Sequence, residues 1–326
     1  MDHKDNIIKS LDILRKQEIA NKEPWKARAY AKVIAQLQII PTITKYEDIA
    51  SVTGVGEKIE EKIREILATG SLKSAVRAKE EHSLDALDAL MACYGIGPAK
   101  AKDLVGVHGI KSIADLREKV AVNPALLNEN QIAGLTYYED LRQRIPRTEM
   151  LEHEALLRSH IPAGACAEIV GSFRRQAETS GDIDMLLCSA DHKALTDLVT
   201  ALRTAGYIKK ILALGEKKCM AIIALGATAR RLDILLTPPE QYPFAILYFT
   251  GSDTFNIAFR QHALDRGYTL NEHALTPLLS TDPIIKTEKD IFSFLGLVYT
   301  PPEKRVGAVT HKRKIRLIKP PIITEN

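Results

Sequence analysis

The stretch GSFRRQAETSGDIDMLL, residues 171–187, decides the fold of the second half of the chain. It ends in Asp182 and Asp184, which are separated by the apolar Ile183. Side chains alternate between the two faces of a strand, so this pattern predicts both aspartates on one face and Ile183 on the other. Like charges on one face repel each other. A bound cation would offset that repulsion, and the sequence therefore predicts a cation site here.

A second aspartate-bearing strand is predicted in ARRLDILL, with Arg231, Asp233 and Leu235 on one face. An Asp-x-Asp pair and a third Asp from a neighbouring strand form an oxygen-only ligand set, which suits Mg²⁺ rather than zinc. Exposed turns also contain Asp-x-Asp, but here the loop at 171–175 adds glycine, serine and two arginines, which suit phosphate. Together these features predict metal-dependent nucleotidyl transfer.

Composition and charge restrict the class of protein. The chain has 326 residues, of which 45% are hydrophobic and 26% charged, as is typical of two or three soluble domains. The net charge of +4 permits an anionic partner. No run of roughly 18 apolar residues predicts a membrane span, and the amino terminus lacks an apolar signal core.

The spacing of the four cysteines predicts that the protein works in a reducing environment. Cys93, Cys166, Cys188 and Cys219 form no CxxC pair and lie far apart in the sequence. We expect reduced, buried thiols and therefore an intracellular, reducing compartment, with nucleus and cytoplasm both open.

Residues 1 to about 145 are predicted to be mostly helical and contain a near-repeat. VTGVGEKIEEKIREIL (52–67) and CYGIGPAKAKDLV (93–105) each place apolar–Gly–apolar–Gly before a helix. Glycine permits the tight turn, and the free N–H groups of the helix that follows can bind a phosphate. The two copies predict helix-hairpin-helix elements that grip a nucleic-acid backbone. Two well-packed αα-hairpins are the alternative.

Basic residues near the first copy suggest either phosphate binding or covalent chemistry. Lys58 and Lys62 are four residues apart and lie on one helix face. A solvated phosphate-binding face is one interpretation, and a neutral lysine that attacks an aldehyde to form a Schiff base is the other. Lys26 adjoins Trp25, which is suited either to stacking on a base or to ordinary packing.

From about residue 165 the sequence predicts an α+β region. The short apolar runs AEIVGSF, DIDMLLC, CMAIIAL and RLDILL are separated by polar or glycine-containing stretches, with the helical DHKALTDLVTALRTAG between two of them. Prolines at 238, 239 and 243 predict a break before a third region.

These motifs, in this order, resemble those of the family X DNA polymerases. GSFRRQAETSGDID is similar to the family's nucleotidyltransferase signature, RRLDILL to its third-carboxylate strand, and LYFTGSDTFN and HALDRGYTLNEH to its nucleotide-pocket segments. The layout resembles that of DNA polymerase beta over about residues 10 to 300. The resemblance implies an α+β fold with a helical amino-terminal half that carries two helix-hairpin-helix motifs. A nucleotidyltransferase palm with a small mixed sheet and a small carboxy-terminal α+β subdomain would follow.

The resemblance also implies domain limits. We expect a DNA-binding and deoxyribose-phosphate lyase domain at 1–78 and a helix-hairpin-helix subdomain at 79–142. A palm at 143–240 and a nucleotide-selection subdomain with a basic tail at 241–326 complete the chain.

The resemblance assigns residues to the transfer of a nucleotide. Asp182 and Asp184 would hold two Mg²⁺ ions, for which Mn²⁺ can substitute, and Asp233 would bind the catalytic ion. The residues expected at the incoming nucleotide are Arg144, Ser172, Arg175 and Gly181 at the triphosphate, Tyr248, Phe249 and Gly251 at the sugar, and Asp253 and Asn256 at the base.

A second group of residues would contact DNA. Lys62 would be the Schiff-base nucleophile of the lyase, and the turns would each hold Na⁺ or K⁺ against a DNA phosphate. The remaining residues expected at DNA are Trp25, Lys26, Lys58, the turn glycines Gly54, Gly56, Gly95 and Gly97, and Arg231 and Arg260.

The chain departs from the family pattern at three informative positions. Gln176 stands where a glycine is usual, which would restrict the phosphate loop. Leu235 replaces a basic residue that can pair with a metal-binding aspartate in an inactive conformation, and His273 lies where an aromatic residue is common. The tail at 301–326 is predicted to be solvated, with DNA affinity or nuclear import as alternatives.

We therefore expect a monomeric, template-directed DNA polymerase that fills short gaps in base-excision repair. Its partners would be gapped or nicked double-stranded DNA and deoxynucleoside triphosphates, with no membrane. A template-independent nucleotidyltransferase and a non-catalytic DNA-gap-binding scaffold are the alternatives. The effects of Gln176, Leu235 and His273 on fidelity stay open at this point.

Overall fold

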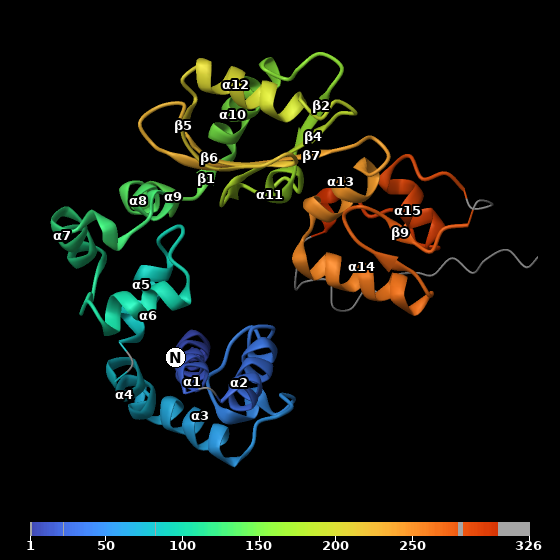
Figure 1. The fold of residues 1–326 in the computed structure, drawn as a ribbon. Helices are drawn as coiled ribbons and strands as arrows, with labels where there is room; N and C mark the ends of the chain where they lie inside the picture. The colour runs from blue at the N-terminus through green and yellow to red at the C-terminus, as the bar shows by residue number, and fades with distance from the viewer. Residues whose placement is uncertain (1, 22, 82, 280–282, 306–326) are drawn as a thin grey trace, which may run out of the picture. The chain divides into compact units, whose positions relative to one another are not determined.

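The computed structural model describes residues 2–21, 23–81, 83–279 and 283–305 (Figure 1). The chain forms two compact units, residues 1–136 and residues 137–326. The predicted basic tail lies, from residue 306 onward, outside the described residues. None of the described helices is long and apolar enough to cross a membrane.

The amino-terminal unit is helical, as predicted. Its first core forms because apolar side chains recur at helical spacing, so Ile7, Leu11 and Leu14 of the first helix all point inward against Ile63 and Ile66 of the third. The elements of this unit are α1 (Lys4–Ala20), α2 (Pro24–Leu37), η1 (Tyr46–Ile49), α3 (Glu57–Thr69), α4 (Lys73–Glu81), α5 (Leu84–Met91), α6 (Pro98–Gly106), α7 (Ile113–Val122), η2 (Pro124–Leu126) and α8 (Glu129–Thr136).

A close backbone contact in this unit requires a glycine. A Cβ added to Gly134 in α8 would lie 2.2 Å from the carbonyl oxygen of Tyr94, which is far inside van der Waals contact. The turn before α6 can therefore approach α8 only because position 134 has no side chain.

The second unit contains the sheet that the sequence predicted. Its strands lie in the order β2-β4-β7-β6-β5, with β4 parallel to β7 and the other neighbours antiparallel. The sheet is therefore mixed, and the predicted fold class is confirmed. The strands are β2 (Cys166–Ile169), β4 (Ile183–Cys188), β5 (Ile208–Leu214), β6 (Lys218–Ile223) and β7 (Arg230–Thr237).

Two details of this sheet differ from the expectation. The run AEIVGSF does not continue as a strand, because β2 ends at Ile169 and the short helix α11 (Gly171–Arg174) begins two residues later. The edge strand β5 was not predicted. Lysines interrupt its apolar residues, which makes the pattern weak.

The two faces of the sheet have different roles. Ile183, Met185 and Leu187 of β4 and the alternate residues of β7 pack into the main core of this unit. Helices α10 (Arg147–Ser159) and α12 (Ala194–Thr204) cover that face. Asp184 and Asp233 are therefore on the opposite face, where Leu186 packs under α13 (Tyr242–Thr250). The predicted alternation of side chains along β4, with the aspartates on one face and Ile183 on the other, is confirmed.

The last part of this unit is a small subdomain with its own core. Aromatic side chains gather between its helices, with Phe259 and Phe292 in an edge-to-face contact at 4.7 Å between ring centroids. Its elements are α13, α14 (Asp253–Asp265), β8 (Thr269–Leu270), β9 (Leu275–Thr276), α15 (Glu288–Phe294) and η3 (Pro302–Lys304). Helix α9 (Tyr138–Leu141) and the two-residue strands β1 (Ile145–Pro146) and β3 (Thr179–Ser180) complete the unit.

Candidate active site

Two of the three predicted aspartates lie side by side. Asp184 on β4 and Asp233 on β7 are direct neighbours in the register of the parallel pair, so their side chains leave the same face of the sheet. Asp182 precedes β4 by one residue and lies on the same side in the alternation of that strand. The sequence-predicted placement of the carboxylates on one sheet face is what the structure shows.

Positive side chains meet these carboxylates. Nη2 of Arg231 contacts an oxygen of Asp182, and its Nε lies 3.6 Å from Oδ1 of Asp233. Nζ of Lys218, on the neighbouring strand β6, lies 3.4 Å from Oδ2 of Asp233. The Arg231 guanidinium thus lies between the carboxylates of Asp182 and Asp233. A bound cation would occupy that place in its absence.

Electrostatics favour a cation at this place. Burial raises the pKa of Asp184, the adjacent carboxylate of Asp233 raises it further, and Lys218 opposes them. Oδ1 of Asp233 is buried and has no hydrogen-bond partner among the described residues. An orphaned buried carboxylate oxygen beside a second carboxylate fits a hard cation with oxygen ligands.

Asp182 is paired with Arg231 and does not form a three-carboxylate cluster with Asp184 and Asp233. In residues 2–21, 23–81, 83–279 and 283–305, no three His, Cys, Asp or Glu side chains stand close enough together to hold a metal ion. The pairing of Asp182 with Arg231 accounts for this, since the guanidinium lies where the third carboxylate would join Asp233. The residues therefore fit a metal, provided that Arg231 moves.

The loop after β2 brings backbone close to the aspartates. Gly171 has φ +60°, and a Cβ there would lie 3.0 Å from Oδ2 of Asp184. Ser172 is the second residue of α11, and its hydroxyl donates to the hydroxyl of Ser180 at 3.0 Å. Gln176 closes this loop with φ +61°, a left-handed conformation that favours glycine. A glycine would adopt this left-handed φ without strain, whereas the backbone of Gln176 is strained by its side chain.

The predicted triphosphate residues line the same approach to the site. Arg175 donates from Nη1 to the carbonyl of Thr250 at 2.6 Å, and burial lowers the pKa of its guanidinium while Asp253 opposes that effect. Arg144 donates to Thr179 through Nε at 3.0 Å and Nη2 at 2.6 Å. A Cβ on Gly181 would lie 3.4 Å from Nη1 of Arg144. Both arginines are thus held by the protein near the loop at 171–181.

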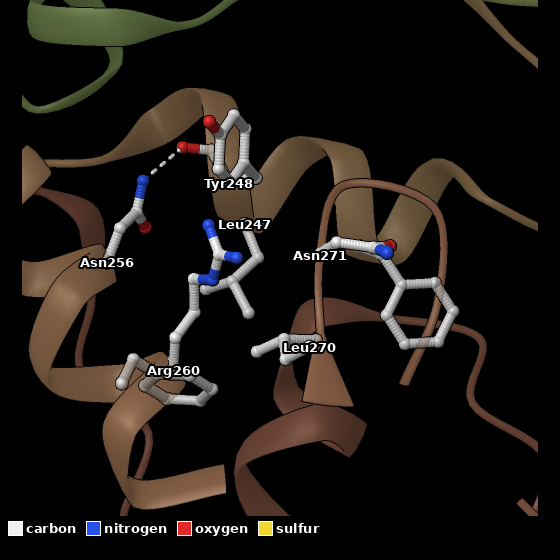
Figure 2. A pocket seen from close by; sticks show the side chains of 8 residues that line it. Leu247, Tyr248, Asn256, Arg260, Leu270 and Asn271 are labelled. Atoms are coloured by element: carbon white, nitrogen blue, oxygen red, sulfur yellow. Dashed lines mark hydrogen bonds between the residues drawn. The ribbon is translucent and has the colours of Figure 1, made fainter. Parts of the chain in front are cut away.

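Two of the predicted sugar and base residues, Tyr248 and Asn256, line a pocket between α13, α14 and the β8–β9 hairpin, whereas Phe249, Gly251 and Asp253 are not among its lining residues (Figure 2). Nδ2 of Asn256 donates to the backbone carbonyl of Tyr248 at 2.7 Å, which connects the two helices. Phe249 contacts Tyr248 edge-to-face, with ring centroids 5.1 Å apart. Arg260 extends from α14 along this pocket toward Tyr248. A planar polar ligand would meet both aromatic edges and amide donors here.

Gly251 joins α13 to α14 with φ +64°, and a Cβ there would lie 3.2 Å from Nη1 of Arg175. Asp253 is the first residue of α14, and its carboxylate favours the charged form of the Arg175 guanidinium. The glycine allows the arginine of one segment to lie against the backbone of the next.

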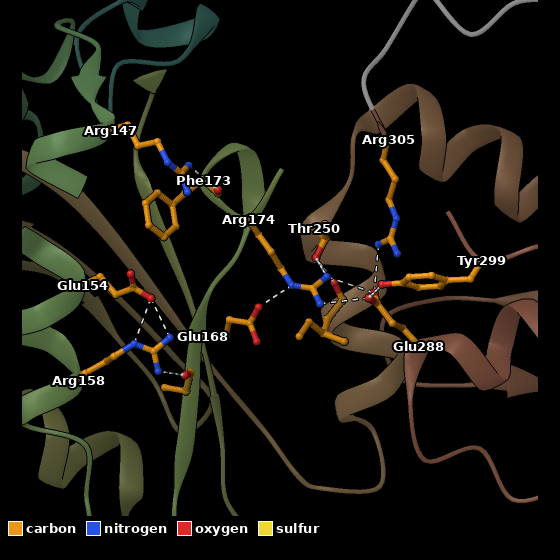
Figure 3. A network of polar contacts seen from close by, with 12 residues as sticks. Arg147, Glu154, Arg158, Glu168, Phe173, Arg174, Thr250, Glu288, Tyr299 and Arg305 are labelled. Carbon is orange, nitrogen blue, oxygen red and sulfur yellow. Dashed lines mark hydrogen bonds and ion pairs between the residues drawn. The ribbon is translucent and has the colours of Figure 1, made fainter. Parts of the chain in front are cut away.

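A polar network that sequence reasoning missed joins the palm sheet to the last subdomain (Figure 3). Arg174 contacts Glu168 of β2 at 2.6 Å, donates to the Thr250 hydroxyl at 2.8 Å and pairs with Glu288 of α15 at 3.1 Å. Glu288 also pairs with Arg305 at 3.1 Å. Burial raises the pKa of Glu288, but hydrogen bonds from both arginines outweigh burial and hold it below its usual value.

No local sequence signal identifies this network. Glu288 lies 114 residues from Arg174 in the sequence. It is the first residue of a helix whose start, TEKD, has the pattern of an ordinary capping box, so its sequence indicates capping rather than a distant ion pair. Lys218 was also missed, although its place directly before the run CMAIIAL was a signal. A lysine that begins a strand beside a predicted carboxylate strand is a candidate neighbour of that carboxylate.

The two Gly-x-Gly turns of the first unit share one backbone geometry. Gly54 and Gly95 have φ +88° and +82°, while Gly56 and Gly97 cap α3 and α6 with nearly identical extended angles. The carbonyl of Gly95 accepts a hydrogen bond from Gln131 at 3.0 Å, so one acceptor of the second turn is already used. The free N–H groups at the starts of α3 and α6 are available for an anion.

The predicted lysines of this unit have separate local partners. Lys62 is half-buried and its Nζ donates to the carbonyl of Lys58, one turn earlier, at 2.9 Å. Lys26 lies over the exposed Trp25 ring at 5.1 Å and is within 3.8 Å of Glu18. The exposure of Trp25, 65%, favours stacking over packing. Lys32, which sequence reasoning missed, has its side chain against the Gly54 turn.

Comparisons with known proteins match four successive segments of the chain between residues 2 and 306. Residues 2–72 match the family described as a helix-hairpin-helix domain, and 88–142 the fingers domain of DNA polymerase lambda. Residues 144–239 match the DNA polymerase beta palm, and 245–306 the DNA polymerase beta thumb.

Individual relatives agree with these matches. DNA polymerase lambda of Rattus norvegicus is 32% identical over 92% of this chain and 56% of its own length, and that of Arabidopsis thaliana is 27% identical over 87% and 58%. The human DNA-directed DNA/RNA polymerase mu is 23% identical over 93% of this chain and 69% of its own. The chain thus spans between half and two thirds of the length of the two lambda relatives.

Proposed function

The chain belongs to family X of the DNA polymerases, and from that premise we propose that it is a template-directed DNA polymerase that fills short gaps during repair. Its substrates would be gapped double-stranded DNA and deoxynucleoside triphosphates. The observation that carries this proposal is the register of Asp184 and Asp233, which places two carboxylates together beside the Gly171 loop.

The described side chains support specific roles. Arg175 belongs to the loop at 171–181 and Arg144 donates to Thr179 of that loop, so both guanidinium groups suit the triphosphate of an incoming nucleotide. Asn256 and Tyr248 suit its base and sugar, since they border one pocket through a shared hydrogen bond. Arg260, further along the same pocket, suits the template strand.

Two divalent ions, Mg²⁺ with Mn²⁺ as a substitute, would be held by Asp182, Asp184 and Asp233. Such ions supply an activated primer hydroxyl and a stabilised leaving pyrophosphate. Asp233 supports this assignment with its buried Oδ1, which has no hydrogen-bond partner among the described residues. Arg231 would release Asp182 when the ions bind and would then be free to meet DNA phosphate, in agreement with its assignment to the DNA-binding residues.

Asp233→Asn tests the enzymatic proposal. We expect it to reduce nucleotide addition at a one-nucleotide gap at least about a thousandfold, because one metal-ligand interaction contributes several kcal/mol to the transition state and each 1.36 kcal/mol is tenfold in rate. Gap binding should stay intact. Asp197→Asn, an exposed change on α12 at the opposite face of the sheet, is the matched control. Normal addition by Asp233→Asn would refute the proposal, and no addition by the unchanged chain would favour the scaffold.

Template dependence has a separate test. Arg260 borders the same pocket as Tyr248 and Asn256, where it can meet a template base opposite an incoming nucleotide. Extension of gapped duplex should exceed extension of a single strand by orders of magnitude. Equal extension of both would favour the template-independent transferase.

We also propose deoxyribose-phosphate lyase activity with Lys62 as the nucleophile and Lys26 and Lys58 at the 5′-phosphate. The half-buried position of Lys62 one turn from Lys58 supports this, because it places two amines on one face. Borohydride should trap the unchanged chain on an incised abasic site, and Lys62→Ala should abolish trapping while Lys73→Ala, at the start of α4, should not. Equal trapping by Lys62→Ala would exclude Lys62. Na⁺ or K⁺ at the two Gly-x-Gly turns, a monomeric state and an intracellular location belong to the same proposal.

A further inference from the structure

Two free cysteines face each other across neighbouring strands. Cys166 on β2 and Cys188 on β4 are direct register partners, and both are unpaired thiols. Strand pairing thus brings together two cysteines that lie 22 residues apart in sequence. The expectation of burial was wrong for Cys166, which is exposed.

The geometry of this pair permits a covalent bond. The Val170 N–H donates to the Asp184 carbonyl at 2.8 Å, and hydrogen-bonded pairs recur every second residue, so Cys166 and Cys188 form such a pair as well. The Cα atoms in pairs of this kind are about 5.5 Å apart. Disulfides span Cα distances of about 4.4–6.8 Å. The Cβ atoms of opposed residues are about 4.5–5.5 Å apart, at the long end in hydrogen-bonded pairs, whereas a disulfide needs about 3.5–4.5 Å. The two strands must therefore close by about 1 Å at this pair for the sulfurs to bond.

The two thiols differ in their surroundings in a way that sets an order of reaction. Cys166 lies on an edge strand and is open to solvent, whereas Cys188 is 8% exposed. Burial raises the pKa of the Cys188 thiol to about 11, and the adjacent Cys166 adds to that effect. Cys188 is thus protected from direct attack, and Cys166 is the thiol that a dissolved oxidant meets first.

The pair lies next to the network that joins the sheet to the last subdomain. Glu168 is two residues after Cys166 on the same face of β2 and holds Arg174 at 2.6 Å. Burial raises the pKa of Tyr242, at the start of α13, and the charges of Glu168, Cys166 and Cys188 raise it further. A bond at 166–188 would tie the strand of Glu168 to the strand of Asp184.

We propose that Cys166 and Cys188 are a redox-sensitive pair that closes a reversible disulfide when the protein meets a peroxide. The Cys166 sulfur, after losing its proton, takes one oxygen from hydrogen peroxide to give a sulfenic acid, and the second oxygen leaves as water. The Cys188 sulfur then displaces the sulfenic hydroxyl, its proton leaves with that hydroxyl as a second water, and the S–S bond forms. Two thiols lose two electrons, which one peroxide accepts, and a dithiol reductant returns them.

The test uses the full chain with hydrogen peroxide as the oxidant. After oxidation, free thiols should fall from four to two per chain, and mass spectrometry of an alkylated, non-reduced digest should find Cys166 linked to Cys188. Dithiothreitol should restore all four. Cys219→Ser, which changes a buried thiol of β6, is the matched control and should still form the linked peptide.

Single variants separate the two steps. Cys188→Ser should leave Cys166 as a sulfenic acid that dimedone captures, and Cys166→Ser, an exposed change that preserves the core, should leave Cys188 reduced. Oxidation of Cys166 in the unchanged chain without any linked peptide would overturn the proposal. So would a disulfide found only between chains, or equal oxidation of Cys188 in Cys166→Ser.

Discussion

Glu288 carries a large share of the stability of the second unit, and Glu288→Gln tests this. The carboxylate is buried, with 7% of its side chain exposed, and lies between Arg174 and Arg305 at 3.1 Å from each. The Tyr299 hydroxyl also donates a hydrogen bond to it, at 2.7 Å. Glutamine has nearly the same shape but no charge, so the variant removes the anion and leaves packing almost unchanged.

The loss of unfolding free energy in Glu288→Gln depends on which interactions Arg174 and Arg305 retain. Arg174 retains Glu168 at 2.6 Å, so its charge stays compensated. Arg305 has a fully buried side chain that also donates to the Thr300 carbonyl at 2.8 Å and lies over nearby aromatic rings. The glutamine oxygen can still accept one hydrogen bond, but it carries no charge, so this guanidinium loses its anionic partner. A buried charge left without its partner costs about 3–5 kcal/mol. For a unit of this size that loss lowers Tm by roughly 6–20 °C.

Thermal unfolding followed by circular dichroism, in the absence of DNA, measures this effect. The matched control is Glu168→Gln, which removes the other carboxylate of Arg174 at a site 37% exposed. It should cost at most about 1 kcal/mol because solvent screens that pair. A Glu288→Gln variant that unfolds within about 1 kcal/mol of the unchanged chain would show that Arg305 does not depend on this carboxylate.

Three further predictions follow from single residues. Gly134→Ala should destabilise the first unit by about 1–3 kcal/mol because its Cβ meets a backbone carbonyl at 2.2 Å, whereas Gly106→Ala, with open space around it, should be neutral or stabilising in chemical denaturation. Gln176→Gly should stabilise the second unit by up to about 1 kcal/mol, since it relieves a left-handed φ, and a lower denaturation midpoint would contradict that reason. The pKa of Glu288 lies below its ordinary 4.5 in the folded chain, so its contribution is complete above pH 4.5 and is lost as pH falls through the folded value. Midpoints measured from pH 7 downward should show this loss in the unchanged chain but not in Glu288→Gln.

Local patterns determined much of the fold and the core of the site. Alternation along DIDMLL and RRLDILL was enough to place Asp184 and Asp233 on polar faces, because a side chain buried on one face fixes the register parity of the whole strand. Helical spacing identified α1, and glycines at apolar–Gly–apolar–Gly identified the two turns, since few other residues adopt φ near +85°.

The order of strands and the contacts between distant segments were decided only in the tertiary structure. Nothing in the local sequence states that β4 lies between β2 and β7, yet that order brings Asp184 beside Asp233 and Cys188 beside Cys166. The pairing of Arg231 with Asp182 likewise arises from the meeting of two strands. Periodicity reports which face of an element is buried, but the identity of the neighbour depends on the free energy of packing the whole chain, to which residues far apart in sequence contribute equally.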